Sequence, residues 1–278
     1  MEDGLYLIAC AFSFCMGAVV SSFLNVVIWR VPRGESIVSP PSHCPKCGAG
    51  IRWWMNVPIL SYLALRGKCA SCRAPISPRY PFVEALGGAL FLASFLRNGV
   101  SPETLVWWVW ISLMIVGSFI DFDHKLLPDF VTVGGMVLGL AVGIAVSLVR
   151  FAGFSGSWAA AFAPLWWSAG GLAFGFGLMW LVRFLGSKAF GREAMGMGDV
   201  FLMGAVGALF GPVAVLVTLI LSSILGSVAG LGLIALSKFK VARFVEIPYG
   251  PYICMGVLAW MFCGGEIVYW YLNLFARG

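Results

Sequence analysis

Charged residues are scarce in this chain. Asp, Glu, Lys and Arg make up 11% of its 278 residues, against roughly 25% in an average soluble domain. Hydrophobic residues make up 60%, and their runs lack the alternation with polar residues that membrane β-strands show. Because a backbone in lipid must satisfy its own hydrogen bonds, these runs are predicted to be helices. We therefore predict an all-α polytopic membrane protein.

Nucleotide-binding motifs are also missing. No Gly-x-Gly-x-x-Gly follows a predicted strand. The glycines before Asp199 are not followed by the Lys-Ser/Thr pair that a phosphate-binding P-loop requires. The net charge is +6, but the basic residues lie in loops beside apolar runs, so they indicate membrane topology and not a nucleic-acid surface. The first run, 4–29, is too long for a signal-peptide core and follows an acidic flank, which predicts a retained helix.

Eight apolar segments are predicted to cross the membrane. The run 200–237 is too long for one span of about 20 residues, and Gly211-Pro212 is its natural break. The chain is thereby divided into a first transmembrane helix (1–29), a cytoplasmic loop (30–79) and a transmembrane core (80–278). The predicted segments are 4–29, 80–97, 103–121, 129–149, 164–185, 199–210, 213–236 and 250–272.

Lys and Arg residues predict the orientation. With the N-terminus outside, 15 of the 18 Lys and Arg residues fall in cytoplasmic loops, among them Lys238, Lys240 and Arg243. Both termini are then outside, and the loop 30–79 is cytoplasmic. Asp121 ends the third segment and Asp199 begins the sixth, so both acids are predicted at the cytoplasmic side of the membrane.

Four of the eight cysteines form a spaced set. Cys44 and Cys47 make one C-x2-C pair, and Cys69 and Cys72 make a second pair after an interval of 21 residues. This pattern predicts a tetrahedral zinc site, with a redox dithiol or unrelated free cysteines as the alternatives. Four thiolates leave no open coordination position, so the metal is expected to be structural. Glycines 48 and 67 are expected to form the tight turns of the two pairs.

Two acids stand at the edges of long apolar runs, where ionisable residues are costly and mark functional sites. Asp121 and Asp199 are predicted to form a carboxylate dyad for aspartyl-type hydrolysis. Asp199 at a helix N-terminus is expected to be the base, and Asp121 at a helix C-terminus the acid. Asp123 and Asp129 fit ordinary loop or N-cap acids, and His124 fits a solvated loop residue.

Two other classes of protein remain open at this point. A proton- or metal-coupled transporter would use the two acids as a relay and the cysteine loop as a sensor. A non-enzymatic scaffold would display the metal loop on a membrane anchor, but it leaves the acids unexplained. Replacing each Asp by Asn separates the classes, because a protease loses its activity and a scaffold does not.

Several short motifs, in this order and spacing, resemble those of the bacterial type IV prepilin peptidase family. The resemblance covers nearly the whole chain. Besides the two cysteine pairs, it is carried by Gly17–Arg30, Asn56–Tyr62 with Leu65–Lys68, Arg79–Glu84, Ile120-Asp121 with Leu127–Asp129, Gly196–Asp199 and Ile247–Pro251.

The resemblance implies a GxGD-type membrane aspartyl protease with Asp121 and Asp199 as its catalytic pair. The implied substrates are prepilins or pseudopilins, which are cut after a Gly that ends a short basic leader. The new N-terminal residue, usually Phe, is then methylated from S-adenosylmethionine. The implied surroundings are the lipid of the bacterial inner membrane, and no nucleic acid is a partner.

The motifs leave the methyl-donor site unassigned. Glu84 is a candidate for contact with the methyl donor or the substrate, and an ordinary helix-start charge is the alternative. The turn Tyr249–Pro251 is expected near the dyad, and a plain helix-start turn is again the alternative.

Overall fold

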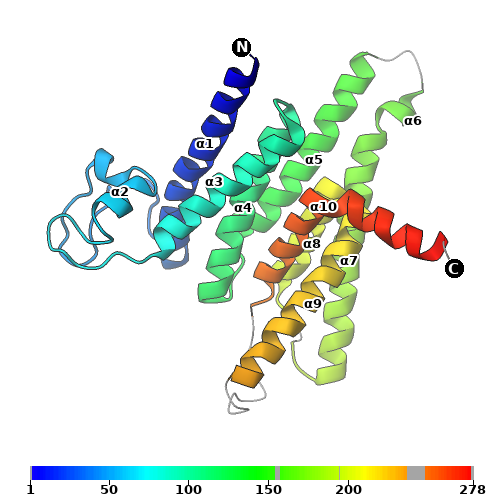
Figure 1. Ribbon diagram of the computed structural model, residues 1–278. Helices are drawn as coiled ribbons and strands as arrows, with labels where there is room; N and C mark the ends of the chain where they lie inside the picture. The colour runs from blue at the N-terminus through cyan, green and yellow to red at the C-terminus, as the bar shows by residue number, and fades with distance from the viewer. Residues whose placement is uncertain (1, 154–156, 194, 237–247, 277–278) are drawn as a thin grey trace. The chain divides into compact units, whose positions relative to one another are not determined.

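The structure, a computed structural model, describes residues 2–153, 157–193, 195–236 and 248–276 (Figure 1). Over these residues the regular secondary structure is helical, apart from two isolated β-bridges in the cysteine loop. The all-α prediction is therefore confirmed. Lys238, Lys240 and Arg243, predicted to be cytoplasmic, and Ile247 of the last motif lie outside the described residues.

Each of the eight predicted segments lies within one helix of the described chain. Two further short helices, α2 and α6, lie in connections, and two 3-10 helices, η1 (Val31–Arg33) and η2 (Trp53–Asn56), lie in the cysteine loop. The α-helices are α1 (Glu2–Arg30), α2 (Leu60–Ala64), α3 (Arg79–Asn98), α4 (Pro102–His124), α5 (Asp129–Ala152), α6 (Trp158–Ala161), α7 (Ala163–Phe190), α8 (Met197–Phe210), α9 (Pro212–Leu236) and α10 (Gly250–Ala276).

Six stretches within the described residues are long and apolar enough to cross a membrane, so the protein is a multi-pass membrane protein. The two other predicted segments, α3 and α8, are not among these six stretches, each for its own physical reason. Helix α3 carries Arg79, Glu84 and Arg97, and the 14 residues of α8 span only about 21 Å of a hydrocarbon core of about 30 Å. The six candidate spans are Gly4–Arg33, Pro102–His124, Asp129–Ala152, Ala163–Phe190, Pro212–Leu236 and Gly250–Leu274.

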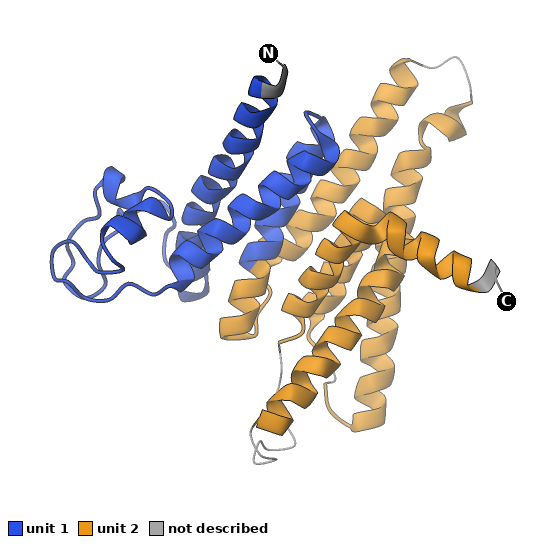
Figure 2. Ribbon diagram, in the orientation of Figure 1, with its two compact units in different colours: residues 1–116 blue, residues 117–278 orange. Residues whose placement is uncertain are grey.

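The chain forms two compact units, residues 1–116 and 117–278 (Figure 2). In unit 1, α1 and α3 pack closely because small residues face each other. A Cβ atom on Gly87 would overlap the Ser21 hydroxyl of α1. The start of α4 is held to α3 by Trp108, whose ring stacks on Phe91 at 4.9 Å between centroids and whose indole N–H donates to the Phe91 carbonyl at 3.2 Å.

Unit 2 is built around the short helix α8. Five of its apolar side chains are fully buried, so α8 is enclosed by protein. Helix α7 crosses α8 at Gly171 and Gly207, where a Cβ atom on either glycine would overlap the carbonyl oxygen of the other. On another side α5 approaches through Gly139, where a Cβ atom would lie 2.6 Å from that of Ala208. These close approaches fix the helix that carries Asp199.

The predicted break between the sixth and seventh segments is confirmed. Helix α8 ends at Phe210, Gly211 adopts a positive φ of 83°, and α9 begins at Pro212. The Gly211 N–H donates to the Gly207 carbonyl at 2.9 Å and thereby closes the last turn of α8. Proline cannot continue the hydrogen-bonding pattern of α8, so the chain turns and starts a new helix.

Candidate active site and metal centre

Unit 2 brings Asp121 and Asp199 together. Asp121 lies near the end of α4 and Asp199 is the third residue of α8; both are buried, with 6% and 8% of their surfaces exposed. Their carboxyl groups are close enough to interact electrostatically. By contrast, Asp123, His124 and Asp129 are exposed. Of the acids that compete in this part of the sequence, only the predicted pair shares one buried location.

A backbone group from α10 holds the carboxylate of Asp121. The N–H of Gly250 donates to Asp121 Oδ2 at 2.9 Å, and a Cβ atom on Gly250 would lie only 2.7 Å from that oxygen. The preceding residue, Tyr249, is anchored to α9 by its hydroxyl, 2.7 Å from Ser222 Oγ. The turn Tyr249–Pro251 therefore lies at the dyad. This confirms the expectation that placed the turn near the two acids.

Leu127 spaces the helices that carry the two acids. Its side chain is buried, and it packs directly against glycines from three elements. A larger residue at any of these glycines would place its Cβ atom close to Leu127. A Cβ atom would lie 2.8 Å from Leu127 at Gly198, 3.2 Å at Gly250 and 3.5 Å at Gly117. The leucine of the Leu-Pro-Asp motif thus packs among α4, α8 and α10.

Arg183 of α7 fixes the turn that precedes Asp199. Its Nε–H donates to the Met195 carbonyl at 2.9 Å, and its terminal nitrogen pairs with the Glu193 carboxylate at 3.0 Å. This contact holds the chain just before the Gly-Met-Gly-Asp segment. In the sequence, Arg183 is one of the 15 Lys and Arg residues predicted to lie in cytoplasmic loops, and nothing in its position indicates this contact.

One hydrogen bond distinguishes the two carboxyl groups, whose acid and base roles stay a prediction. The prediction considered only the helices on which the two acids lie. Asp121, however, accepts a hydrogen bond from the first residue of another helix, and such a donor stabilises a negatively charged oxygen. Within the described residues, the Asp199 carboxyl receives no hydrogen bond. This difference supports, as a proposal, Asp121 as the base and Asp199 as the acid.

The four cysteines of unit 1 converge as a metal site. Their Sγ atoms all lie within 4.8 Å of one another, and those of Cys44 and Cys72 are 3.9 Å apart. A tetrahedral zinc ion with Zn–S bonds of about 2.3 Å requires an S–S separation of about 3.8 Å. Backbone N–H groups of Cys47 and Lys46 lower the pKa of the Cys44 thiol to about 6, whereas the hydrogen bond with Cys72 raises the pKa of Cys47 to about 11. Without a metal, the cluster therefore holds both thiolate and thiol.

The two cysteine pairs adopt the same turn. In each pair, the N–H of the first cysteine donates to the carbonyl five residues later, at 2.9 and 2.8 Å. The residue after each second cysteine has a positive φ, 71° at Gly48 and 62° at Arg73. The expectation for Gly48 is thus confirmed, and Gly67 also adopts a positive φ, 66°, in a tight turn. Gly67 lies before the second pair, where its N–H donates to the Tyr62 carbonyl.

Removing one thiolate is expected to unfold this loop locally. Binding of structural zinc contributes about 10–16 kcal/mol to the folding of small zinc modules, and Cys72→Ser replaces a strong ligand by a weak one. We expect the variant to lose its bound metal and the amides of residues 43–76 to exchange with solvent much faster. Metal analysis with hydrogen exchange checks this, and Cys263→Ser is the matched control. Unchanged metal content would show that Cys72 is not a ligand.

Glu84 anchors the cysteine loop to α3. Its side chain is buried, and Oε2 accepts the N–H of Ile59 at 2.7 Å. Ile59 has a φ of 62°, a conformation that β-branched residues strongly disfavour. The hydrogen bond therefore holds a strained turn in place, and it gives Glu84 a role that neither expectation from the sequence described.

Loss of this anchor is expected to loosen the turn around Ile59. A hydrogen bond to a charged group contributes about 1.5–3 kcal/mol, so Glu84→Ala should accelerate exchange of the Ile59 amide by about tenfold or more. Glu103→Ala, which removes an exposed acid from the first turn of α4, is the control. Equal protection of Ile59 in both variants would contradict the anchoring role.

Comparison with known proteins places these features in one family. Residues 15–98 match the family described as the bacterial peptidase A24 N-terminal domain, and residues 108–231 match the type IV leader peptidase family. No solved structure matches the chain.

Relatives named prepilin leader peptidase/N-methyltransferase occur in several bacteria. The protein from Myxococcus xanthus is 41% identical over 79% of this chain and 62% of its own length. Those from Pseudomonas putida and Legionella pneumophila are each 34% identical, over 91% and 97% of this chain and 90% and 95% of their own lengths. The resemblance read from the motifs is confirmed, and the chain belongs to the type IV leader peptidase family of prepilin leader peptidase/N-methyltransferases.

Proposed function

We propose that Asp121 and Asp199 form the catalytic dyad of a membrane aspartyl endopeptidase that removes the basic leader of type IV prepilins and pseudopilins. The observation that carries this proposal is the burial of two interacting carboxyl groups on α4 and α8, with one of them held by the Gly250 N–H. A buried carboxyl pair shares one proton, because like charges at short range cannot both ionise. This is the state that aspartyl hydrolysis requires.

In the proposed mechanism, the charged carboxylate of Asp121 accepts a proton from water while that water attacks the scissile carbonyl carbon. Because Oδ2 is engaged by Gly250, the proton goes to Oδ1. Asp199 donates its proton to the carbonyl oxygen, so the tetrahedral intermediate is neutral. The C–N bond then breaks as the protonated Asp121 gives its proton to the leaving amine. Asp199 regains its proton from the intermediate's hydroxyl group, and the dyad returns to its starting state.

The substrate and the topology are part of the same proposal. The termini are outside, the loop 30–79 is cytoplasmic, and both acids lie at the cytoplasmic side of the inner membrane. A prepilin is a membrane helix whose basic leader stays in the cytoplasm, so its scissile bond, after a Gly, lies at that depth. Residues 1–29, 30–79 and 80–278 then serve as anchor helix, metal loop and peptidase core.

Unit 1 serves the methyl-transfer half of the proposed function. The metal of the cysteine cluster is zinc, and it is structural because four thiolates complete its tetrahedral shell. S-adenosylmethionine, when bound, supplies the methyl group for the amine that cleavage creates. The chain's own part is to bind this donor.

The proposal is tested with purified protein in detergent and a synthetic prepilin whose leader ends in Gly. We expect mass spectrometry to show a product that begins after this Gly, and a heavier, N-methylated product when S-adenosylmethionine is added. A prepilin with Gly replaced by a bulky residue is the control and should remain intact. If the wild-type protein leaves the first prepilin uncut, the proposal is contradicted and the transporter alternative is favoured.

A further inference from the structure

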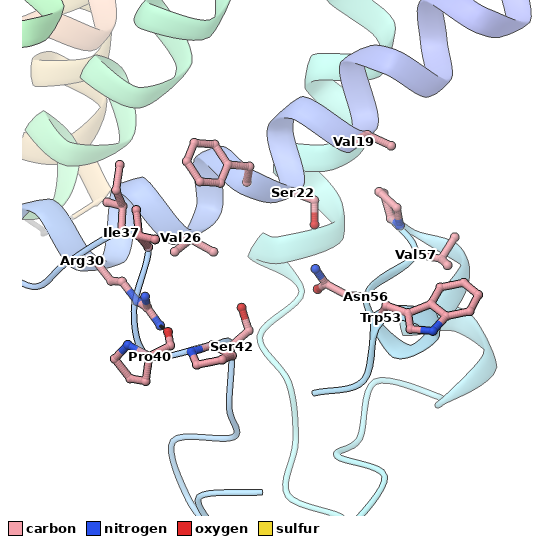
Figure 3. A pocket seen from close by; sticks show the side chains of 14 residues that line it. Val19, Ser22, Val26, Arg30, Ile37, Pro40, Ser42, Trp53, Asn56 and Val57 are labelled. Carbon is pink, nitrogen blue, oxygen red and sulfur yellow. Dashed lines mark hydrogen bonds between the residues drawn. The ribbon is translucent and has the colours of Figure 1, made fainter. Parts of the chain in front are cut away.

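Unit 1 contains a pocket of about 530 Å³ that the peptidase chemistry does not use. Its walls come from the second half of α1, from the segment 37–42 and from the turn 53–58. Figure 3 shows Arg30, Pro40 and Ser42 on one side and Trp53 and Asn56 on the other. The volume lies within the range of about 300–1,000 Å³ that small-molecule sites occupy.

A buried cation lines this pocket. Arg30 is only 7% exposed. Its guanidinium donates to the carbonyl oxygens of Ser36 at 2.8 Å and Pro40 at 2.7 Å. Two of its five N–H donors are used in this way, and no carboxylate of the described residues pairs with it. A buried guanidinium with free donors and no counter-ion favours a ligand that carries a carboxylate or another anion.

The remaining walls are suited to an aromatic and partly apolar ligand. Val19, Val26 and Ile37 supply apolar surface, and Asn56 supplies hydrogen-bonding groups. Trp53 leaves 79% of its surface exposed, and its ring is supported edge-on by a second tryptophan at 5.5 Å between centroids. An exposed indole face stacks on planar rings and attracts cations.

The lining also excludes one occupant. It contains a cation and no acidic side chain, so the basic leader of a prepilin would meet repulsion and find no counter-charge. A small ligand with a carboxylate for Arg30 and a planar ring for Trp53 fits this lining better. The methyl donor of the proposed function has both groups, and its ammonium and sulfonium can be contacted by the oxygen atoms of Ser42 and Asn56 and by the Trp53 ring.

We propose that this pocket binds S-adenosylmethionine, with Arg30 on its carboxylate and Trp53 on its adenine ring or sulfonium. This inference rests on the proposed function and names the site that its methyl-transfer half requires. The Glu84–Ile59 contact supports one wall of the pocket, because Ile59 follows the turn 53–58. The cysteine cluster supports the opposite segment, because Cys44 follows Ser42.

Direct binding tests this site without relying on methylation. Purified full-length protein in lipid nanodiscs is titrated with S-adenosylmethionine by isothermal calorimetry. Trp53→Ala and Arg30→Gln are each expected to weaken binding by about tenfold or more, since each removes a stacking surface or a charge-assisted hydrogen bond. The matched controls Trp166→Ala, at an exposed tryptophan of α7, and Arg33→Gln change the same residue types outside the lining, and they should bind within about twofold of wild type.

The outcomes are distinct. Arg30 also shapes the segment 37–42, so Trp53→Ala decides the result if Arg30→Gln loses its bound metal. If wild type binds and Trp53→Ala binds equally well, the pocket is not the donor site, although the methyl-transfer half stands. If wild type does not bind with or without a cleaved prepilin, that half fails together with the site. Displacement of S-adenosylmethionine by anionic lipid but not by S-adenosylhomocysteine would show a lipid headgroup site and overturn the proposal.

Discussion

Asp121→Asn and Asp199→Asn are each expected to lower kcat for prepilin cleavage by about 10²- to 10⁴-fold, the usual contribution of a positioned proton-transfer group. Asparagine has nearly the same shape, and at position 121 its carbonyl oxygen still accepts the Gly250 N–H. The fold should therefore persist while the dyad loses the proton that it shares. Single-turnover cleavage of a synthetic prepilin measures the effect without interference from product release.

Two further comparisons make this prediction specific. The double variant should be no slower than either single variant, because two groups that act as one unit give non-additive losses. Asp123→Asn changes an exposed acid two residues from Asp121 and should keep most of the activity. If Asp199→Asn cleaves at nearly the wild-type rate while Asp123→Asn does not, the assignment of the dyad is wrong.

The helices of this protein were predictable because their signal is local. A run of apolar residues without charges indicates a membrane helix wherever it occurs, and a Gly-Pro step ends one. The same holds for the metal cluster, since the spacing of Cys44, Cys47, Cys69 and Cys72 already brings each pair to one ion. The number of spans was not predictable in the same way: eight segments were predicted, and six are long and apolar enough to cross a membrane. Hydropathy alone does not reveal that α8 is enclosed by protein.

The parts of the site that escaped prediction depend on backbone groups and on contacts between distant residues. The N–H of Gly250 acts on an aspartate 129 residues away, and every non-proline residue carries such a donor, so residue type gives no signal. The proposal that Asp121 is the base and Asp199 the acid, which reverses the prediction from the sequence, rests on this hydrogen bond. The strained φ of Ile59 is equally invisible, because an isoleucine in the sequence predicts extended or helical backbone.

Gly250→Ala is expected to lower kcat/KM for cleavage by about 10²-fold, although it adds only a methyl group. The new Cβ atom would lie 2.7 Å from Asp121 Oδ2 and 3.2 Å from Leu127, so the carboxylate must move. A displacement of about 1 Å at a catalytic group is enough for such a loss. Global stability should not fall, because φ at this position is not positive and alanine favours a helix more than glycine does.

A loss of activity without a loss of stability in Gly250→Ala would show that Gly250 positions the Asp121 carboxylate and is not needed for the fold. Gly265→Ala lies in the same helix, meets nothing within 4 Å and should cleave like wild type. Tyr249→Phe removes the hydroxyl that anchors the turn to Ser222, so a smaller loss of about three- to tenfold is expected from one hydrogen bond. Full activity in Gly250→Ala would show that the Asp121 carboxylate relaxes around the methyl group. If the loss of activity is largest for Gly250→Ala, smaller for Tyr249→Phe and absent for Gly265→Ala, the start of α10 holds the dyad in its reactive geometry.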